Sequence, residues 1–216
     1  MNKASLDQWL ARLENIHPKE IDLGLERVGR VARSLGLVPL EQPVVTVAGT
    51  NGKGSTVAVL EALLLETGHC TGTFTSPHFL RFNERIRVGG QEVSDDEIIT
   101  AFAAIEEARG TTRLTYFEFA TLAALLVFRE RRPDIVILEI GLGGRLDAVN
   151  VVDPTVAVIT SIDLDHQDWL GPSRDDIARE KAGILRHLAP AVIADPHPPA
   201  SLQSCIEMVG ASPTLY

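Results

Sequence analysis

The pattern of apolar and polar positions predicts strands and helices that follow one another along the chain. Short β-branched and apolar runs without helical periodicity predict strands. These runs cover residues 44–48, 70–75, 134–140, 155–162 and 191–194. Segments with apolar residues at helical spacing predict the helices between them. They cover 5–16, 53–67, 95–108, about 120–128 and 173–185, with weaker helices ending near residues 35 and 210.

The order of these segments predicts the fold class. A strand, a crossover helix and a second strand with a short return favour parallel pairing, with helices covering the sheet. Residues 79–93 break this order, because Gly89-Gly90 between two short runs predicts a small hairpin or flap. We therefore expect an α/β fold with a mostly parallel sheet flanked by helices.

The flap carries three arginines. They are Arg81, Arg85 and Arg87. Plain surface charge and a site for an anionic substrate are equally good interpretations of them at this stage.

The first strand runs directly into a glycine-rich loop and then into a helix. Three glycines allow a tight turn whose N–H groups face inward, and the positive end of the helix dipole lies behind them. Lys53 can reach the β/γ-phosphates of a nucleotide, and the hydroxyl of Ser55 or of Thr56 is available to a phosphate-bound Mg²⁺. The predicted phosphate-binding residues are Gly49, Thr50, Asn51, Gly52, Lys53, Gly54, Ser55 and Thr56.

This loop has the pattern G-x-x-G-K-G-S, which departs from the spacing of the common phosphate loop. The alternative is a glycine-rich turn that binds nothing. Folding alone gives no reason for a lysine and two hydroxyls at a junction between strand and helix, so we favour a polyphosphate site.

Polar residues stand at the ends of three further predicted strands. Ser76 follows the second strand, Glu139 is the only interior charge of the run at 134–140, and His166 follows the run at 155–162. The carboxyl ends of parallel strands meet at the ligand-binding edge of such sheets. A buried carboxylate costs several kcal/mol unless a cation neutralises it, so Glu139 favours a metal site over a structural ion pair. The alternatives are a turn serine for Ser76 and a structural histidine for His166.

Two further stretches have less specific patterns. Residues 141–150 form a second glycine-rich loop, where backbone can approach a ligand closely, although the glycine spacing is wrong for a dinucleotide fingerprint. In the helix at 173–185, the local charge pattern predicts that Lys181 is a solvated surface residue.

Composition narrows the class of protein. The 216 residues carry a net charge of −9 with 45% hydrophobic residues, which suits a folded α/β domain and disfavours a general nucleic-acid surface. Two cysteines do not indicate a disulfide or zinc framework. No apolar run has the length of a membrane span and no signal peptide is evident, so we expect a cytoplasmic protein without membrane or nucleic-acid partners.

Several motifs occur in an order that resembles the folylpolyglutamate synthase family of the Mur-ligase superfamily. They lie at residues 49–55, 75–78, 82–85, 139–147, 165–168 and 180–185. Residues 114–119 and 21–27 resemble more specifically the bacterial bifunctional members, which are also dihydrofolate synthases. The resemblance implies a P-loop NTPase-like Mur-ligase central domain at 41–216, preceded by a helical and pterin-loop segment at 1–40.

The resemblance also implies a reaction. ATP would phosphorylate the carboxylate of dihydropteroate, or the γ-carboxylate of a tetrahydrofolate, to an acyl phosphate in the presence of Mg²⁺. The amine of L-glutamate would then displace phosphate. Charge neutralisation and positioning are what such phosphoryl transfer requires of a protein.

Site residues follow from the same resemblance. It implies that Lys53, His166 and Lys181 take part in catalysis, with Lys181 carbamylated, in contrast to its interpretation as a surface residue. The implied Mg²⁺ ligands are Ser76, Glu139, His166 and Lys181. The implied pterin-binding residues are Ile21, Leu23, Thr115, Phe117, Asp147 and Ala148.

The chain is shorter than members of this family, which carry a second, C-terminal ligase domain. We therefore expect that domain to be absent here, and a full-length protein to act as a monomer. Two alternatives remain open at this stage. One is a Mur-type ligase for a cell-wall precursor, and the other is a phosphate-loop nucleotide-binding module without ligase activity.

Overall fold

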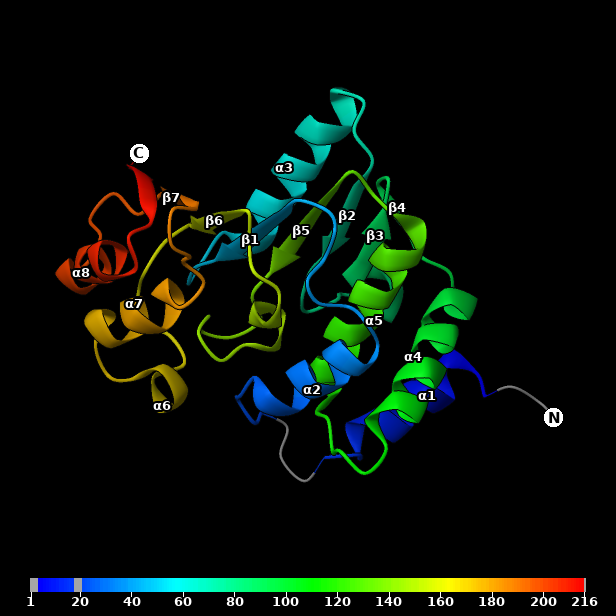
Figure 1. Cartoon of the computed structure of the whole chain (residues 1–216). Coiled ribbons are helices and arrows are strands. Elements are labelled where there is room, and N and C mark those ends of the chain that lie inside the picture. The colour runs from blue at the N-terminus through cyan, green and yellow to red at the C-terminus, as the bar shows by residue number, and fades with distance from the viewer. Residues whose placement is uncertain (1–3, 18–20, 216) are drawn as a thin grey trace.

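The structure, a computed structural model, describes residues 4–17 and 21–215. Its centre is a sheet of eight strands in the order β4-β3-β2-β5-β1-β6-β7-β8 (Figure 1). The strands are β1 Val44–Ala48, β2 Thr71–Phe74, β3 Ile86–Val88, β4 Gln91–Glu92, β5 Ile135–Glu139, β6 Val156–Ile159, β7 Pro190–Ile193 and β8 Ser212–Leu215. The strands β2, β5, β1, β6, β7 and β8 are neighbours in this order, and each pair is parallel. At the β2 end of the sheet, β3 and β4 add an antiparallel hairpin.

Helices cover both faces of this sheet. They are α1 Leu6–Glu14, α2 Glu26–Ser34, α3 Lys53–Glu66, α4 Asp95–Arg109, α5 Tyr116–Arg131, α6 Gln167–Leu170, α7 Arg174–Ala182 and α8 Ala200–Val209, with 3-10 turns η1 Phe82–Arg85 and η2 Ala148–Val151. Figure 1 shows α3 on one side of the central strands and α1, α2, α4 and α5 grouped on the other. The predicted α/β fold with a mostly parallel sheet is confirmed.

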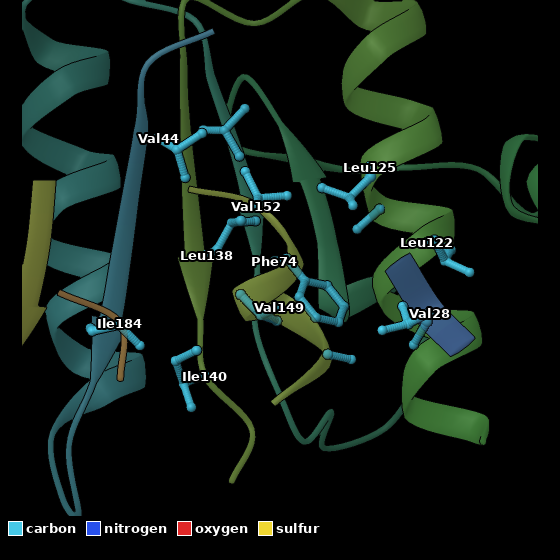
Figure 2. Close-up of a cluster of buried hydrophobic side chains, with 14 of the residues drawn as sticks. Val28, Val44, Phe74, Leu122, Leu125, Leu138, Ile140, Val149, Val152 and Ile184 are labelled. Atoms are coloured by element: carbon cyan, nitrogen blue, oxygen red, sulfur yellow. The ribbon is translucent and has the colours of Figure 1, made fainter. Parts of the chain in front are cut away.

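The central strands are mostly apolar because both of their faces are buried. On the α3 face, Val47, Ile137 and Val158 pack with Val57 of α3. The opposite face belongs to the larger core, where Leu125 of α5 points toward the strands that carry Phe74 and Leu138 (Figure 2) and Leu122 is also buried. The N-terminal helices share this larger core, since Leu6, Leu13 and Val28 are among its buried residues.

The predicted hairpin is confirmed and extends the sheet at its β2 edge. Gly89 and Gly90 form its turn with φ values of 58° and 76°, a region that favours glycine. A capping box begins the next helix, because Ser94 and Glu97 satisfy each other's backbone N–H groups at the start of α4.

Two segments differ from their predicted boundaries. Helix α5 begins at Tyr116 rather than near residue 120, because Thr115 acts as its N-cap and forms a capping box with Glu118. The segment after β6 contains the short helix α6, which is too brief to show a periodic apolar pattern. Among residues 4–17 and 21–215, no helix combines the length and the apolar character needed to cross a bilayer.

Candidate functional site

The glycine-rich loop after β1 contacts Thr160 and Ser161, which follow β6. The N–H of Thr50 donates to the carbonyl of Ser161 at 2.7 Å, and the N–H of Asn51 donates to the Ser161 hydroxyl at 3.1 Å. A Cβ on Gly49, whose φ is 153°, would lie 1.8 Å from Oγ1 of Thr160. The loop can therefore adopt this path only with glycine at position 49. Sequence reasoning did not identify Thr160 and Ser161, which only the pairing of β1 with β6 brings to the loop.

The N–H groups available to an anion begin at Gly52. Gly52 adopts the left-handed region at φ 83° and starts α3, and the amides of residues 52–55 make no hydrogen bond within the described part of the chain. These amides lie at the positive end of the helix dipole, which is where phosphate groups bind. The amides of Thr50 and Asn51 are already engaged by Ser161, so the phosphate-binding part of the predicted loop narrows to residues 52–55.

Lys53 and the two hydroxyl residues differ in their availability. Nζ of Lys53 donates to the carbonyls of Gly49 and Thr50 at 3.0 and 3.2 Å, so the side chain lies across the loop. The Thr56 hydroxyl donates to the Gly52 carbonyl at 2.8 Å, whereas Ser55 lines a cavity beside the loop. The geometry therefore favours Ser55 over Thr56 as the hydroxyl available to a phosphate-bound cation.

The cavity beside the loop has a volume of about 490 Å³, and Glu139 forms part of its wall. Glu139 is 5% exposed, and its Oε2 accepts the backbone N–H of Ser76 at 3.2 Å. Burial raises the pKa of this carboxyl, while the Ser76 amide and the charge of Lys53 act in the opposite direction. Gly54 lies against the same carboxylate, since a Cβ there would stand 3.8 Å from both of its oxygens. A buried carboxylate with one hydrogen bond, facing an anion-binding loop, fits a divalent cation shared with phosphate.

Lys181 is not the surface residue that the local charge pattern predicts. It is 3% exposed, and burial followed by the nearby charge of Lys53 lowers its pKa from 10.5 to about 8. The cause is close packing of α7, since a Cβ on Gly144 would lie 2.7 Å from the carbonyl of Glu180. Only the tertiary contact of the second glycine-rich loop with α7 removes this lysine from water.

His166 is exposed and occupies the left-handed region at φ 47°. It lines a cavity of about 20 Å³ together with Lys53, Asp165 and Lys181. The predicted metal ligands thus fall into two groups. Ser76 and Glu139 line the larger cavity, and His166 and Lys181 line the smaller one together with Lys53. Among the described residues, no three His, Cys, Asp or Glu side chains are placed to hold a metal by themselves. Their joint role as ligands stays a prediction.

The residues predicted to contact a pterin lie at the same edge of the sheet, after β5 and at the start of α5. Asp147 is 2% exposed, and its carboxylate accepts the N–H groups of Leu142 at 2.8 Å and Val149 at 3.0 Å. Burial raises its pKa from 3.8 to about 7, against the opposing effect of these hydrogen bonds. Ala148 is buried beside it. Both oxygens of Asp147 thus bind its own loop.

Phe117 and Thr115 lie at the start of α5. The Phe117 ring is 5.9 Å from that of Phe74, and a Cβ on Gly141 would lie 2.6 Å from its Cζ. The Thr115 hydroxyl accepts the N–H of Glu118 at 3.2 Å as the helix cap. Both residues therefore have a structural contact, and any contact with a substrate stays a prediction.

The predicted covering loop also reaches this edge. The N–H of Gly24, which follows Ile21 and Leu23, donates to the carbonyl of Leu146 at 3.1 Å, one residue before Asp147. Arg27 joins the loop to α5, because it pairs with Asp22 and with Glu118. Sequence reasoning missed this role of Arg27, since residues 27 and 118 are distant in the chain.

Comparison with known proteins places this geometry in a family. Residues 47–199 match the family described as the Mur ligase middle domain. The chain is 53% identical over 206 residues to a dihydrofolate synthase/folylpolyglutamate synthase of Escherichia coli, and 52% identical over 197 residues to that of Haemophilus influenzae. These matches cover 95% and 91% of the chain, but 49% and 45% of the two relatives. The chain therefore spans about half the length of the curated relatives it matches.

Solved structures give the same result. The Escherichia coli protein in complex with DHPP and ADP superposes with a TM-score of 0.97 and 51% identity, over 98% of this chain and 51% of that one. A bifunctional folylpolyglutamate synthase/dihydrofolate synthase with Mn, AMPPNP and L-glutamate bound superposes with a TM-score of 0.92, over 98% of this chain and 52% of that one. The match of sequence and fold through the phosphate loop, the Glu139 strand and the Lys181 helix shows that the chain belongs to the Mur ligase family.

Proposed function

We propose that this chain is the nucleotide-binding half of an ATP-dependent ligase that adds L-glutamate to dihydropteroate and to tetrahydrofolates. The observation that carries the proposal is the free amides of residues 52–55 facing the buried carboxylate of Glu139 across one cavity. Relatives with this fold bind ADP with DHPP, or AMPPNP with Mn and L-glutamate. Those ligands support ATP, a divalent cation, dihydropteroate and L-glutamate as the ligands of this protein, while the tetrahydrofolates rest on the resemblance of the sequence motifs.

The phosphate groups of ATP would bind where the chain offers positive partners. The amides of residues 52–55 would donate to phosphate oxygens. Nζ of Lys53 would leave the carbonyls of Gly49 and Thr50 and donate to phosphate instead. A bound Mg²⁺ would neutralise charge on the transferring phosphoryl group. Glu139 would hold this cation, with the hydroxyls of Ser55 and Ser76 in the same cavity wall. The protein contributes position and electrostatics, as phosphoryl transfer requires.

The acid substrate would lie along the edge formed by Phe117, Asp147 and the loop at 21–24. An aromatic ring suits stacking with a flat heterocycle, and a carboxyl suits its amino and ring N–H groups. The substrate carboxylate attacks the γ-phosphorus of ATP, which yields an acyl phosphate and ADP. The amine of L-glutamate then forms the amide bond and releases phosphate and a proton.

Lys181 is placed to become an acidic group. Its pKa of about 8 leaves a substantial neutral fraction near physiological pH, and only the neutral amine attacks CO₂. The product, a carbamate with loss of one proton, would face Lys53 and His166 in their shared cavity. We propose that this carbamate and His166 complete a second cation site.

The alternatives fit less well. A nucleotide-binding module without ligase activity gives no reason for the second cavity with His166 and Lys181. A ligase for a cell-wall precursor gives no reason for an aromatic ring and a buried carboxyl at the same edge. The negative net charge disfavours nucleic-acid partners, and we expect a cytoplasmic enzyme whose full-length form is a monomer.

The test is a calorimetric titration of dihydropteroate into the chain saturated with Mg²⁺ and a non-hydrolysable ATP analogue. We expect saturable binding that is weakened by Asp147→Ala and retained by Asp153→Ala, since Asp153 is an exposed surface residue. Nucleotide binding without any dihydropteroate binding would instead favour the nucleotide-binding module.

A further inference from the structure

The three arginines of the flap occupy three different environments. Arg81 is 69% exposed at its side chain and pairs with Glu92 on the surface. Arg87 pairs with Glu61 at 3.3 Å. Arg85 is only 8% exposed, and no carboxylate in the described part of the chain forms an ion pair with it. Arg85 is thus a buried cation without a counter-charge.

The position of its guanidinium is nevertheless closely defined. The group lies over the rings of Phe82 and Tyr116, at 5.7 and 5.5 Å from their centroids. Its Nε donates to Nδ1 of His78 at 2.7 Å. Burial and the charge of Arg85 lower the pKa of His78, which favours the neutral imidazole that this hydrogen bond requires. These contacts leave the two terminal nitrogens of Arg85 without a hydrogen bond among residues 4–17 and 21–215.

An unpaired buried charge is costly, and this cost needs an explanation. Burial lowers the pKa of Arg85, which means that its surroundings disfavour the cation. The two aromatic rings compensate in part through cation–π attraction. A structural role does not require a cation here, because an apolar side chain of similar length would fill the same space without that cost. An anion that binds to the two free nitrogens would supply the missing charge.

The surrounding backbone links this cation to both halves of the proposed site. The carbonyl of Arg85 accepts the N–H of Thr75 at 2.9 Å, one residue before Ser76 at the phosphate-loop cavity. Tyr116, which covers the guanidinium, stands between Thr115 and Phe117 at the proposed pterin edge. Arg85 therefore lies between the strand end that leads to Ser76 and the start of α5.

We propose that Arg85 binds a carboxylate of the acid substrate with its two terminal nitrogens. The planar guanidinium presents paired donors that match the two oxygens of a carboxylate. The inference rests on the proposed function, which supplies acids of this class. Two carboxylates could be the partner: the reacting one, which dihydropteroate and tetrahydrofolate both carry, or the α-carboxylate, which only tetrahydrofolate carries.

The test compares Arg85→Met with Arg81→Met as a matched control from the same flap. Each protein is saturated with Mg²⁺ and a non-hydrolysable ATP analogue, and dihydropteroate and tetrahydrofolate are titrated separately by calorimetry. Loss of a charge-assisted pair predicts roughly 10- to 100-fold weaker binding in Arg85→Met. We expect Arg81→Met to bind as the unmodified chain does, because its cation is paired and exposed.

The pattern across the two ligands identifies the source of the carboxylate. Weaker binding of both ligands assigns Arg85 to the reacting carboxylate, and weaker binding of tetrahydrofolate alone assigns it to the α-carboxylate. Unchanged affinities for both ligands would overturn the inference while leaving the proposed function intact. Failure of the unmodified chain to bind either ligand would instead count against the proposed function.

A second variant covers a failure of Arg85→Met to fold, which a thermal melt would reveal. Arg85→Lys keeps the cation and loses the paired donors. We expect intermediate weakening, because a single ammonium cannot make both hydrogen bonds. Affinity equal to that of the unmodified chain in this variant would show that the paired donors are not used.

Discussion

At the scale of single residues, three buried ionisable groups surround Lys53. The pKa values of Glu139 and Asp147 are raised and that of Lys181 is lowered, with burial as the largest cause in each case. Each change favours the neutral form of the group, while Lys53 favours both carboxylates and opposes the second ammonium. Burial in the unliganded site thus works against the charged form of all three groups, and the arrival of phosphate and a cation would change that balance.

Asp147 should impose a pH dependence on stability. Its folded pKa of about 7 lies above the ordinary value of 3.8, so the folded protein holds a proton that the unfolded chain releases. Its contribution to the free energy of unfolding therefore falls as the pH rises from 3.8 to about 7 and is constant above that. Asp147→Asn should remove this decline, which is about 1.4 kcal/mol per pH unit at most.

Urea denaturation at several pH values between 3.8 and about 7, with one value above 7, measures this difference. The exposed Asp153→Asn serves as the control, and its curve should run parallel to that of the unmodified protein. A parallel curve for Asp147→Asn as well would show that Asp147 titrates normally in the folded state.

Lys181 should have the opposite effect on the pH dependence of stability, so that its contribution to the free energy of unfolding rises with pH. Its folded pKa of about 8 lies below 10.5, so the unfolded chain binds the extra proton between these values. Stability contributed by the neutral amine is lost as the pH falls from 10.5 to about 8 and is not lost further below that. Lys181→Met should therefore raise the free energy of unfolding at pH 7 by a few kcal/mol, on the order of 1.4 kcal/mol for each pH unit between the folded and unfolded pKa values.

Denaturation in bicarbonate-free buffer, near pH 7 and again above the ordinary lysine pKa, separates this effect from simple packing. The increase in the free energy of unfolding caused by Lys181→Met should disappear at the higher pH, where the lysine is neutral in both the folded and the unfolded state. A gain of equal size at both values would mean that methionine only packs better than lysine.

At the scale of elements, the parts that sequence predicts well are those whose causes lie close together in the chain. The strand, loop and helix from Val44 to Glu66 follow from β-branched residues, glycines and helical spacing within one stretch. The capping box at Ser94 is equally local. By contrast, the burial of Lys181 depends on Gly144 of a distant loop, and the counter-charge missing at Arg85 is visible only once its neighbours are known.

The second glycine-rich loop shows the same limit. Its sequence predicts close approach of backbone to a ligand, but Gly141 and Gly144 are both required by contacts within the protein itself. A Cβ on Gly141 would meet the Phe117 ring, and one on Gly144 would meet the backbone of α7. The sequence therefore indicates close-approach positions correctly, while their partner can be found only from the fold.

Gly141→Ala tests this contact. The added Cβ would lie 2.6 Å from Cζ of Phe117, so the ring must move, and overpacking of this kind costs about 1–3 kcal/mol. Phe117→Leu shortens the side chain and removes the clash. In a double-mutant cycle measured by urea denaturation, we expect the pair to be destabilised by less than the sum of the single variants. Additive effects would mean that the ring and the loop do not touch in solution.

At the scale of the whole molecule, the parallel strands bring four loops to one edge. The phosphate loop, the turn at Ser76, the loop at 141–147 and the segment at 160–166 all follow the carboxyl ends of β1, β2, β5 and β6. Ligand binding there should stabilise the complete sheet, because a ligand that binds only the folded state raises the free energy of unfolding. Thermal unfolding with ADP alone measures the contribution of the phosphate loop, and the additional effect of Mg²⁺ measures the contribution of Glu139.

We expect ADP alone to raise the midpoint of thermal unfolding modestly, and ADP with Mg²⁺ to raise it further. Saturation at about 100 times Kd adds about 2.7 kcal/mol, which corresponds to roughly 5–10 °C for a chain of this size. Glu139→Gln should abolish the increment due to Mg²⁺ and keep the increment due to ADP alone, because the amides of residues 52–55 are unchanged. The same variant should be at least as stable as the unmodified chain without ligand, since burial disfavours the charged carboxylate that it removes.

Glu130→Gln is the matched control, because Glu130 is an exposed carboxylate of α5 that pairs with Arg129 on the surface. It should show both increments at full size. If Glu139→Gln also kept the full Mg²⁺ increment, the cation would be held without Glu139, and the buried carboxylate would need another partner to account for its place beside the phosphate loop.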